Sequence, residues 1–85
     1  MIPTNQEISR KLREHANQLA KSGDNLYRIR AFRQAAMAVM ALDEDVASIV
    51  TTSGQQALEQ FPGIGKSLAE TIANFVLSGE VGTGR

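Results

Sequence analysis

Apolar residues recur every three or four positions along most of the chain, the spacing that places them on one face of a helix. In the first quarter of the sequence the apolar positions are Ile8, Leu12, Ala16, Leu19 and Ala20. Thr4 and Glu7 have the spacing of a capping box, in which each side chain bonds to the main chain of the other residue. Gly23 can take the left-handed conformation that ends a helix. We therefore predict a first helix that starts at Thr4 and ends before Gly23.

A second stripe of apolar positions follows directly and predicts a helix that runs to about Ala41. Its members are Ile29, Phe32, Ala35, Ala36, Val39 and Leu42. Asp24 or Asn25 can cap the start of this helix, since both side chains accept hydrogen bonds from free main-chain amides. We interpret Met37 and Met40, which also lie at helical spacing, as packing residues.

The next segment predicts two short helices. Asp43 could cap a third helix that extends to about Val50, before Thr51-Thr52-Ser53-Gly54 breaks it. Residues 55–60 fit a further short helix.

The last helix is predicted from about Lys66 to Ser78, where Gly79 ends it. No segment shows the alternation of a strand, so we expect an all-α fold, a compact bundle of four to five short helices. The domain would span residues 1–79, and residues 80–85 would form a flexible C-terminal tail.

Composition narrows the class of protein. The 85 residues contain no cysteine and one histidine, which excludes a disulfide framework and a cysteine nucleophile and argues against a dedicated transition-metal site. No apolar run approaches the roughly 20 residues that span a bilayer, and the N-terminus lacks the pattern of a signal peptide. We expect a cytoplasmic protein with no membrane partner.

The net charge of zero hides an uneven distribution of charges. Residues 1–34 contain seven bases and three acids, a net charge of +4, and residues 35–85 contain two bases and six acids, a net charge of −4. A basic face on a neutral molecule favours an anionic partner at one surface and argues against a strongly nonspecific polyanion binder.

The strongest local motif is Phe61-Pro-Gly-Ile-Gly-Lys-Ser-Leu-Ala69, a tight turn that leads into the last helix. Gly63 and Gly65 permit a positive φ and a close backbone approach, while Ile64 can turn inward as an anchor. Amides at the start of a helix lie at the positive end of its dipole, so a phosphate can dock there without any base being read, and Lys66 adds a cation. The spacing fits neither the phosphate loop of nucleoside triphosphatases nor the dinucleotide fingerprint.

Two segments carry a resemblance to a known family. The run Pro62-Gly-Ile-Gly-Lys-Ser-Leu-Ala-Glu70 resembles the hairpin and second helix of a helix-hairpin-helix DNA-binding motif. The run Asn25-Leu-Tyr-Arg-Ile-Arg-Ala-Phe-Arg-Gln-Ala-Ala36 resembles the second helix of the N-terminal, lyase-type domain of bacterial family X DNA polymerases, the relatives of polymerase beta. Both runs occur in the family's order, within a resemblance that covers roughly residues 5 to 81.

The resemblance implies a monomeric helical domain that binds the DNA backbone at gaps, nicks or recessed ends during DNA repair. A polymerase or repair domain of the same pathway would be a further partner, and the sequence leaves open whether the chain is a fragment or an independent small protein. No cofactor is required, but in this family the hairpin often holds a monovalent cation, Na⁺ or K⁺, through main-chain carbonyls. The matching carbonyls are those of Glu59, Phe61 and Ile64.

Some members of the family also remove deoxyribose phosphate through a lysine that forms a Schiff base. The position that matches this nucleophile is Thr71, which has no amine, and a second lysine position of the family falls at Ser67. Lys66 is a substitute amine, although it lies about 140° from Thr71 around the helix. We assign no catalytic residue, and a lyase that uses a substitute lysine stays an alternative.

The residues expected to contact DNA come from the hairpin and the second helix: Arg28, Gly63, Ile64, Gly65, Lys66 and Ser67. Arg28 matches a lysine of the family's terminal-phosphate pocket, yet it falls within the apolar stripe, where an unpaired cation would be costly. It could therefore pair with an acid, extend outward into solvent, or line a polar pocket near the hairpin.

Other residues have a structural interpretation that competes with a functional one. Tyr27 could stack on an exposed base, but we favour half-buried packing with a solvated hydroxyl. We interpret His15 as a residue at the edge of the core, and Arg30 and Arg33 as solvated surface.

A rival hypothesis is a protein-interaction domain that has lost strong DNA binding. The zero net charge supports it, as do Glu59 and Glu70 on either side of the hairpin, because carboxylates repel phosphate.

Overall fold

Five helical segments make up the computed structural model, which describes residues 3–82 and side chains as far as Ser78. They are α1 (Asn5–Lys21), α2 (Leu26–Ala41), α3 (Val46–Ser53), the 3₁₀ helix η1 (Gln55–Gln60) and α4 (Lys66–Gly82). No strand occurs between residues 3 and 82, so the predicted all-α fold is confirmed.

The start and end of α1 and the start of α2 are set by local hydrogen bonds that confirm the prediction. The Glu7 amide donates to Thr4 Oγ1 at 3.1 Å, and the Thr4 amide donates to Glu7 Oε1 at 2.9 Å. Gly23 follows α1 with a φ of +73°. The side chain of Asn25 caps α2 by accepting from the Tyr27 amide at 2.7 Å.

The start of α3 differs from the prediction, because its first amide is bound by a distant side chain. The Val46 amide donates to Asn5 Oδ1 at 2.8 Å, and Asn5 Nδ2 donates to the Glu44 carbonyl at 2.8 Å. Asp43 therefore does not cap this helix, and Asp45 holds the cap position without a side-chain bond to the main chain. Asn5 thus fastens the start of α1 to the start of α3.

Both α3 and α4 extend beyond their predicted ends. In α3 the helix continues through Thr51 and Thr52 to Ser53, and the hydroxyls of both threonines donate to the Ser48 carbonyl. In α4 the helix passes through Gly79 to Gly82, because a glycine lowers helix propensity without ending a helix outright. The first residues of the expected tail thus belong to α4, and residues 83–85 lie outside the described residues.

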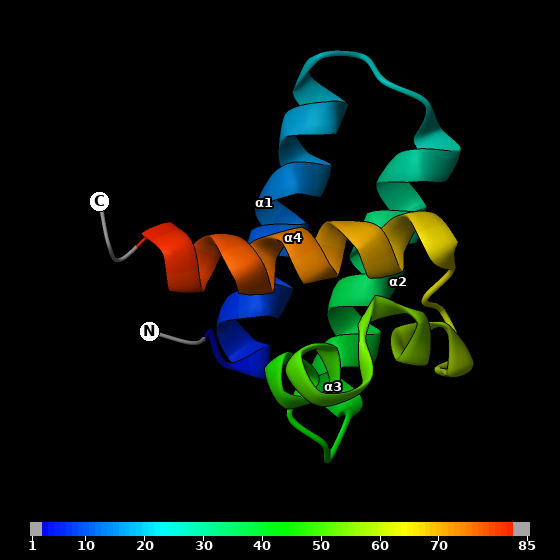
Figure 1. The fold of residues 1–85 in the computed structure, drawn as a ribbon. Coiled ribbons are helices and arrows are strands. Elements are labelled where there is room, and N and C mark those ends of the chain that lie inside the picture. The colour runs from blue at the N-terminus through cyan, green and yellow to red at the C-terminus, as the bar shows by residue number, and fades with distance from the viewer. Residues whose placement is uncertain (1–2, 83–85) are drawn as a thin grey trace.

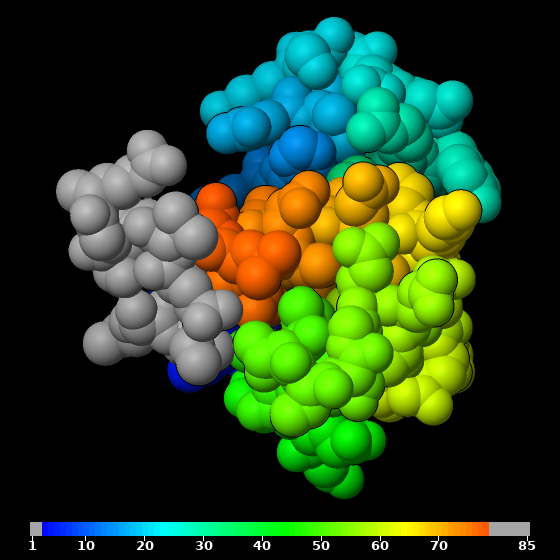
Figure 2. Space-filling model, viewed as in Figure 1, coloured from blue at the N-terminus to red at the C-terminus, as the bar shows by residue number. Residues whose placement is uncertain are grey.

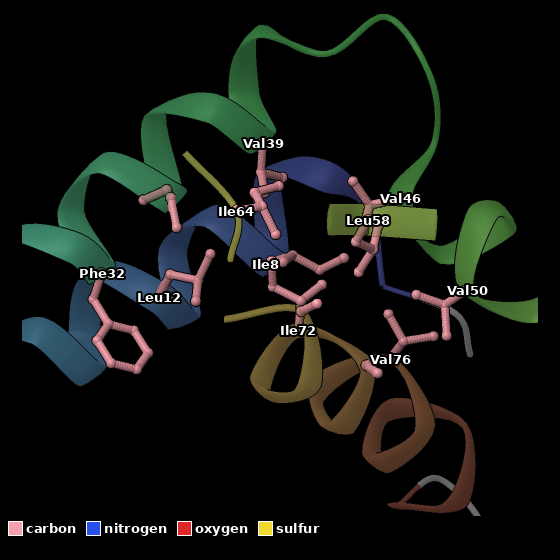
Figure 3. Close-up of a cluster of buried hydrophobic side chains, with 14 of the residues drawn as sticks. Ile8, Leu12, Phe32, Val39, Val46, Val50, Leu58, Ile64, Ile72 and Val76 are labelled. Carbon is pink, nitrogen blue, oxygen red and sulfur yellow. The ribbon is translucent and has the colours of Figure 1, made fainter. Parts of the chain in front are cut away.

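The core lies where three helices meet. In Figure 1, α1 and α2 run side by side in opposite directions and α4 crosses one side of this pair. Ser9 Oγ donates to the Ala36 carbonyl at 2.9 Å, which marks the close approach that the alanines of α2 permit. Figure 3 shows Ile72 of α4 pointing toward Ile8 and Val76 pointing into the same cluster of buried side chains. The most completely buried large side chains are Ile8, Leu12, Val39, Val46, Leu58, Ile72 and Val76.

The edges of the predicted apolar stripes need correction. Met37 and Met40 are 67% and 53% exposed, so their interpretation as packing residues is wrong. Ala20 is also exposed. The half-buried ring of His15 lies 4.6 Å from the ring of Phe32, measured between centroids, as expected of a residue at the edge of the core.

Removing the Asn5 side chain should destabilise the fold, because two hydrogen bonds between α1 and the start of α3 are lost together. We expect Asn5→Ala to lower the free energy of unfolding by about 1–2 kcal/mol in urea denaturation. Asn17→Ala is the matched control, since Asn17 lies exposed on the same helix. An equal loss in both variants would contradict the role of Asn5.

The Glu7 carboxylate makes stability depend on pH. The hydrogen bond from the Thr4 main chain holds the pKa of Glu7 below its ordinary value of 4.5. The folded state therefore prefers the ionised form, and this stabilisation is complete above pH 4.5 and disappears as the pH falls through the lower, folded pKa.

In Glu7→Gln the capping box can persist without a titrating group. Urea midpoints measured across the acidic range should therefore fall less steeply with pH in this variant than in the parent protein. An unchanged pH profile would show that another carboxylate is responsible.

Candidate functional site

The turn between η1 and α4 is held by its own main chain. The Ile64 amide donates to the Phe61 carbonyl at 3.1 Å, which closes a four-residue turn. Pro62 occupies the second position of this turn and Gly63, with a φ of +88°, the third, the arrangement of a type II turn. The side chain of Ile64 is 3% exposed and points toward Val39 in Figure 3, so the predicted inward anchor is confirmed.

The two glycines of the turn have different roles. Both glycines permit a positive φ, and of the two only Gly63 adopts one. A Cβ at Gly63 would lie 3.7 Å from Ala38 Cβ, whereas a Cβ at Gly65 would have no atom within 4 Å. The Gly65 carbonyl accepts from the Ala69 amide at 2.8 Å, so Gly65 is the N-cap residue directly before α4. A side chain at position 65 would therefore point into open space.

Most main-chain amides of the turn are available to a ligand. Within residues 3–82, no hydrogen bond involves the amide of Gly63, Gly65, Lys66 or Ser67, and all four residues are exposed. The Ile64 amide, in contrast, is already bonded to Phe61. Ile64 therefore serves the site as its anchor, and the amides around it provide the free donors.

These amides lie beside α2 in a groove of about 390 Å³. Figure 2 shows the start of α4, in yellow, directly against the first turns of α2, in teal. The groove is lined by Tyr27, Arg28, Ala31, Phe32, Gln34, Gly63, Gly65, Lys66, Ser67 and Leu68. We call it the hairpin groove. It brings together every predicted DNA-contact residue except Ile64.

Two cations of the hairpin groove come from different helices. Arg28 forms an ion pair with Asp24 at 3.5 Å and keeps 55% of its side chain exposed, so it both pairs with an acid and lines the groove. Lys66 is exposed at the start of α4. An exposed pair such as Arg28 and Asp24 contributes little free energy, at most about 1 kcal/mol. The guanidinium can therefore turn to an incoming anion at small cost.

No carboxylate lines the groove. Glu59 and Glu70 are exposed, but neither is among its lining residues. The repulsion of phosphate that these two residues suggested is thus absent from the immediate lining. Asp24 approaches this set through its ion pair with Arg28.

Tyr27 lies at the groove with 79% of its surface exposed. The favoured interpretation of half-buried packing is therefore wrong, and the ring is available as a stacking platform. Tyr27 also shares a neighbouring hollow with Arg30, Ala31 and Gln34. Gln34 also lines the groove and was not among the predicted contact residues, although its helical spacing from Tyr27 and Ala31 places all three on one face.

The residues at the positions of the two family lysines interact with one another. Thr71 Oγ1 donates to the Ser67 carbonyl at 3.1 Å, inside α4. Thr71 is half-buried and does not line the hairpin groove. The amine in this groove is that of Lys66.

The three carbonyls expected to hold a cation belong to this turn and its entry. The Phe61 carbonyl accepts the Ile64 amide, and its second lone pair stays available. Among residues 3–82 there is no cluster of three or more His, Cys, Asp or Glu side chains that could hold a metal ion. In the same range no helix has both the length and the apolar character needed to cross a membrane.

Comparison with protein families places the chain in a known domain family. The family model described as a helix-hairpin-helix domain matches residues 3–81. A search of curated proteins finds no match. The matched range includes α1, α2, α3, the turn and nearly all of α4.

The different conformations of Gly63 and Gly65 predict different costs of substitution. Gly63→Ala forces a Cβ into the left-handed region and should lower the free energy of unfolding by about 1–2 kcal/mol. Gly65→Ala meets no such strain and should cost less. Urea denaturation of the two variants measures the difference, and a greater loss in Gly65→Ala would contradict this account of the turn.

Proposed function

Because the chain belongs to the helix-hairpin-helix domain family, we propose that it is a DNA-binding module that grips the sugar-phosphate backbone without reading the base sequence. Helix-hairpin-helix domains commonly bind DNA. The observation that carries the proposal is the set of unbonded amides at Gly63, Gly65, Lys66 and Ser67 in the hairpin groove.

The chemistry of the groove suits a phosphate. The amides of Lys66 and Ser67 lie at the positive end of the α4 dipole, where an anion is stabilised. Arg28 and Lys66 supply full charges from two sides of the groove. With two or three phosphates neutralised, the logarithm of the binding constant should fall with the logarithm of salt concentration with a slope of about −2 to −3. The isolated chain would bind in the micromolar range or more weakly.

We assign to the same groove a preference for gaps, nicks or recessed ends. Exposed Tyr27 stands beside Arg28, so a base freed at a DNA end could stack on the ring while its phosphate meets the guanidinium. A monovalent cation held by the carbonyls of Glu59, Phe61 and Ile64 would add a bridge to a neighbouring phosphate. This is the behaviour that the resemblance to family X polymerase domains implies, with a role in DNA repair.

Fluorescence anisotropy on gapped, nicked and intact duplexes, each in a salt series, tests the proposal. We expect tighter binding to the gapped duplex and the shallow slope given above. Arg28→Ala and Lys66→Ala should each reduce the magnitude of the slope by about one. Arg10→Ala removes the same charge outside the groove and should change binding little. Indifference of binding to both salt and DNA structure would overturn the proposal.

Gly65→Asp separates DNA binding from folding. An aspartate at the start of α4 should cap the helix by accepting from its free amides, so stability should be retained or increased. The same carboxylate would occupy those amides and repel phosphate, and we expect DNA binding to weaken by at least about tenfold, or 1.4 kcal/mol.

Two measurements on the Gly65→Asp variant are therefore needed, urea denaturation and anisotropy with the gapped duplex. Gly65→Ala is the matched control, because it adds a Cβ without a charge. A stable Gly65→Asp protein that binds DNA like the parent would exclude the hairpin amides as the phosphate site.

A further inference from the structure

A second groove lies on the side of the helix pair that α4 does not cover. On the α4 side of α1, Lys11 Nζ lies 6.0 Å from the centroid of the Phe75 ring. Arg13 follows two residues later, about 200° around the helix, and so faces away from α4. There it lines a hollow of about 310 Å³ with Ser9, Ala36, Met37, Met40 and Ala41. We call this hollow the back groove.

The back groove combines a floor of small residues with exposed apolar walls. Ser9 and Ala36 are buried and joined by a hydrogen bond, so the two helix backbones approach closely at its base. Met37 and Met40, more than half exposed, form the α2 side. Exposed large apolar side chains that gather at one place mark an interaction site more often than scattered ones do. Methionine is suited to such a site because its flexible side chain adapts to a partner.

The side chains that line the back groove carry a net positive charge. The lining contains Arg13 and no acid, and the one ion pair among the described residues is that of Arg28 with Asp24. Arg33 precedes Met37 by one helical turn, and α2 contains no acidic residue. Arg10 and Arg13 share a neighbouring hollow with Glu7, whose carboxylate already accepts from the Thr4 amide.

We propose that the back groove binds an acidic amphipathic helix of a partner protein. A groove between two helices can accept the apolar face of a further helix, and on the other side of this pair α4 packs across both helices (Figure 1). The partner's apolar side chains would pack on Met37 and Met40, and its carboxylates would meet Arg13 and Arg33. The exposed thioethers favour a protein over a polynucleotide, because they offer no donor to a phosphate oxygen.

This surface is distinct from the hairpin groove. Ala31, which lines the hairpin groove, and Met40, which lines the back groove, are nine residues apart and point to opposite sides of α2. The protein partner could therefore bind while the hairpin is occupied. The proposal does not depend on DNA binding, and either can fail alone.

Chemical-shift mapping with a defined peptide tests the proposal. The probe is a helical peptide of about four turns with leucines at i, i+3, i+4 and i+7 and glutamates on both flanks. The control peptide has lysine in place of every glutamate. We expect the acidic peptide to shift the resonances of Ser9, Arg13, Met37 and Met40, and to leave Gly63 and Gly65 unchanged. The basic peptide should bind at least about tenfold more weakly.

Two substitutions test whether the acidic peptide binds through the residues of the back groove. Met37→Glu should weaken binding of the acidic peptide by about tenfold, and Arg13→Glu by about fivefold to tenfold. Leu77→Glu and Lys21→Glu are the matched controls, because both side chains are exposed outside the back groove. All four positions are exposed, and thermal denaturation verifies that each variant is folded.

Several outcomes would overturn the proposal. They are equal binding of the two peptides, shifts confined to the hairpin, or variants at positions 13 and 37 that bind like the parent. Vesicles of anionic lipid and sedimentation of the protein alone test two other occupants. Shifts of the back groove caused by vesicles and not by the acidic peptide would assign it to a membrane surface. Self-association abolished by Met37→Glu would assign it to a second copy of the chain.

Discussion

The burial of one isoleucine holds the hairpin in place. Ile64 fills the core beside Val39, and its amide closes the turn on the Phe61 carbonyl. The side chain of this residue is buried and its amide is bonded within the turn, whereas the amides around it have no acceptor among residues 3–82. Unbonded amides would be costly in the protein interior, and the burial of Ile64 fixes the turn so that these amides stay at the surface. The proposed binding of phosphate depends on these amides remaining exposed.

The helix α2 contributes to three environments at once. One face, with Phe32 and Val39, is buried in the core. A second face, with Tyr27 and Arg28, lines the hairpin groove, and a third, with Met37, lines the back groove. A helix that packs on the core with only one face needs a narrow apolar stripe. The apolar residues of α2 beyond that stripe are therefore exposed and can contact a ligand or partner. This explains why the sequence of α2 contains more large apolar residues than its core contacts use.

Features set by neighbouring residues could be predicted from the sequence, and features set by distant ones could not. The capping box at Thr4, the Asn25 cap and the inward anchor at Ile64 each depend on bonds or spacings within a few residues. The start of α3 depends on Asn5, far away in the sequence, so no local pattern could reveal it. The exposure of Tyr27 and Met37 likewise depends on where α4 crosses the helix pair, and helical spacing alone does not contain that information.

The carboxylate of Asp24, which pairs with Arg28, competes with any anion that enters the hairpin groove. The guanidinium attracts a group with two negative charges more strongly than one with a single charge. A terminal phosphate monoester carries close to two charges at neutral pH, and a phosphodiester within a strand carries one. The ion pair with Asp24 takes the same free energy to break for either group, so Asp24 lowers the overall attraction, and discrimination between chain ends and continuous strands would come from Arg28 itself.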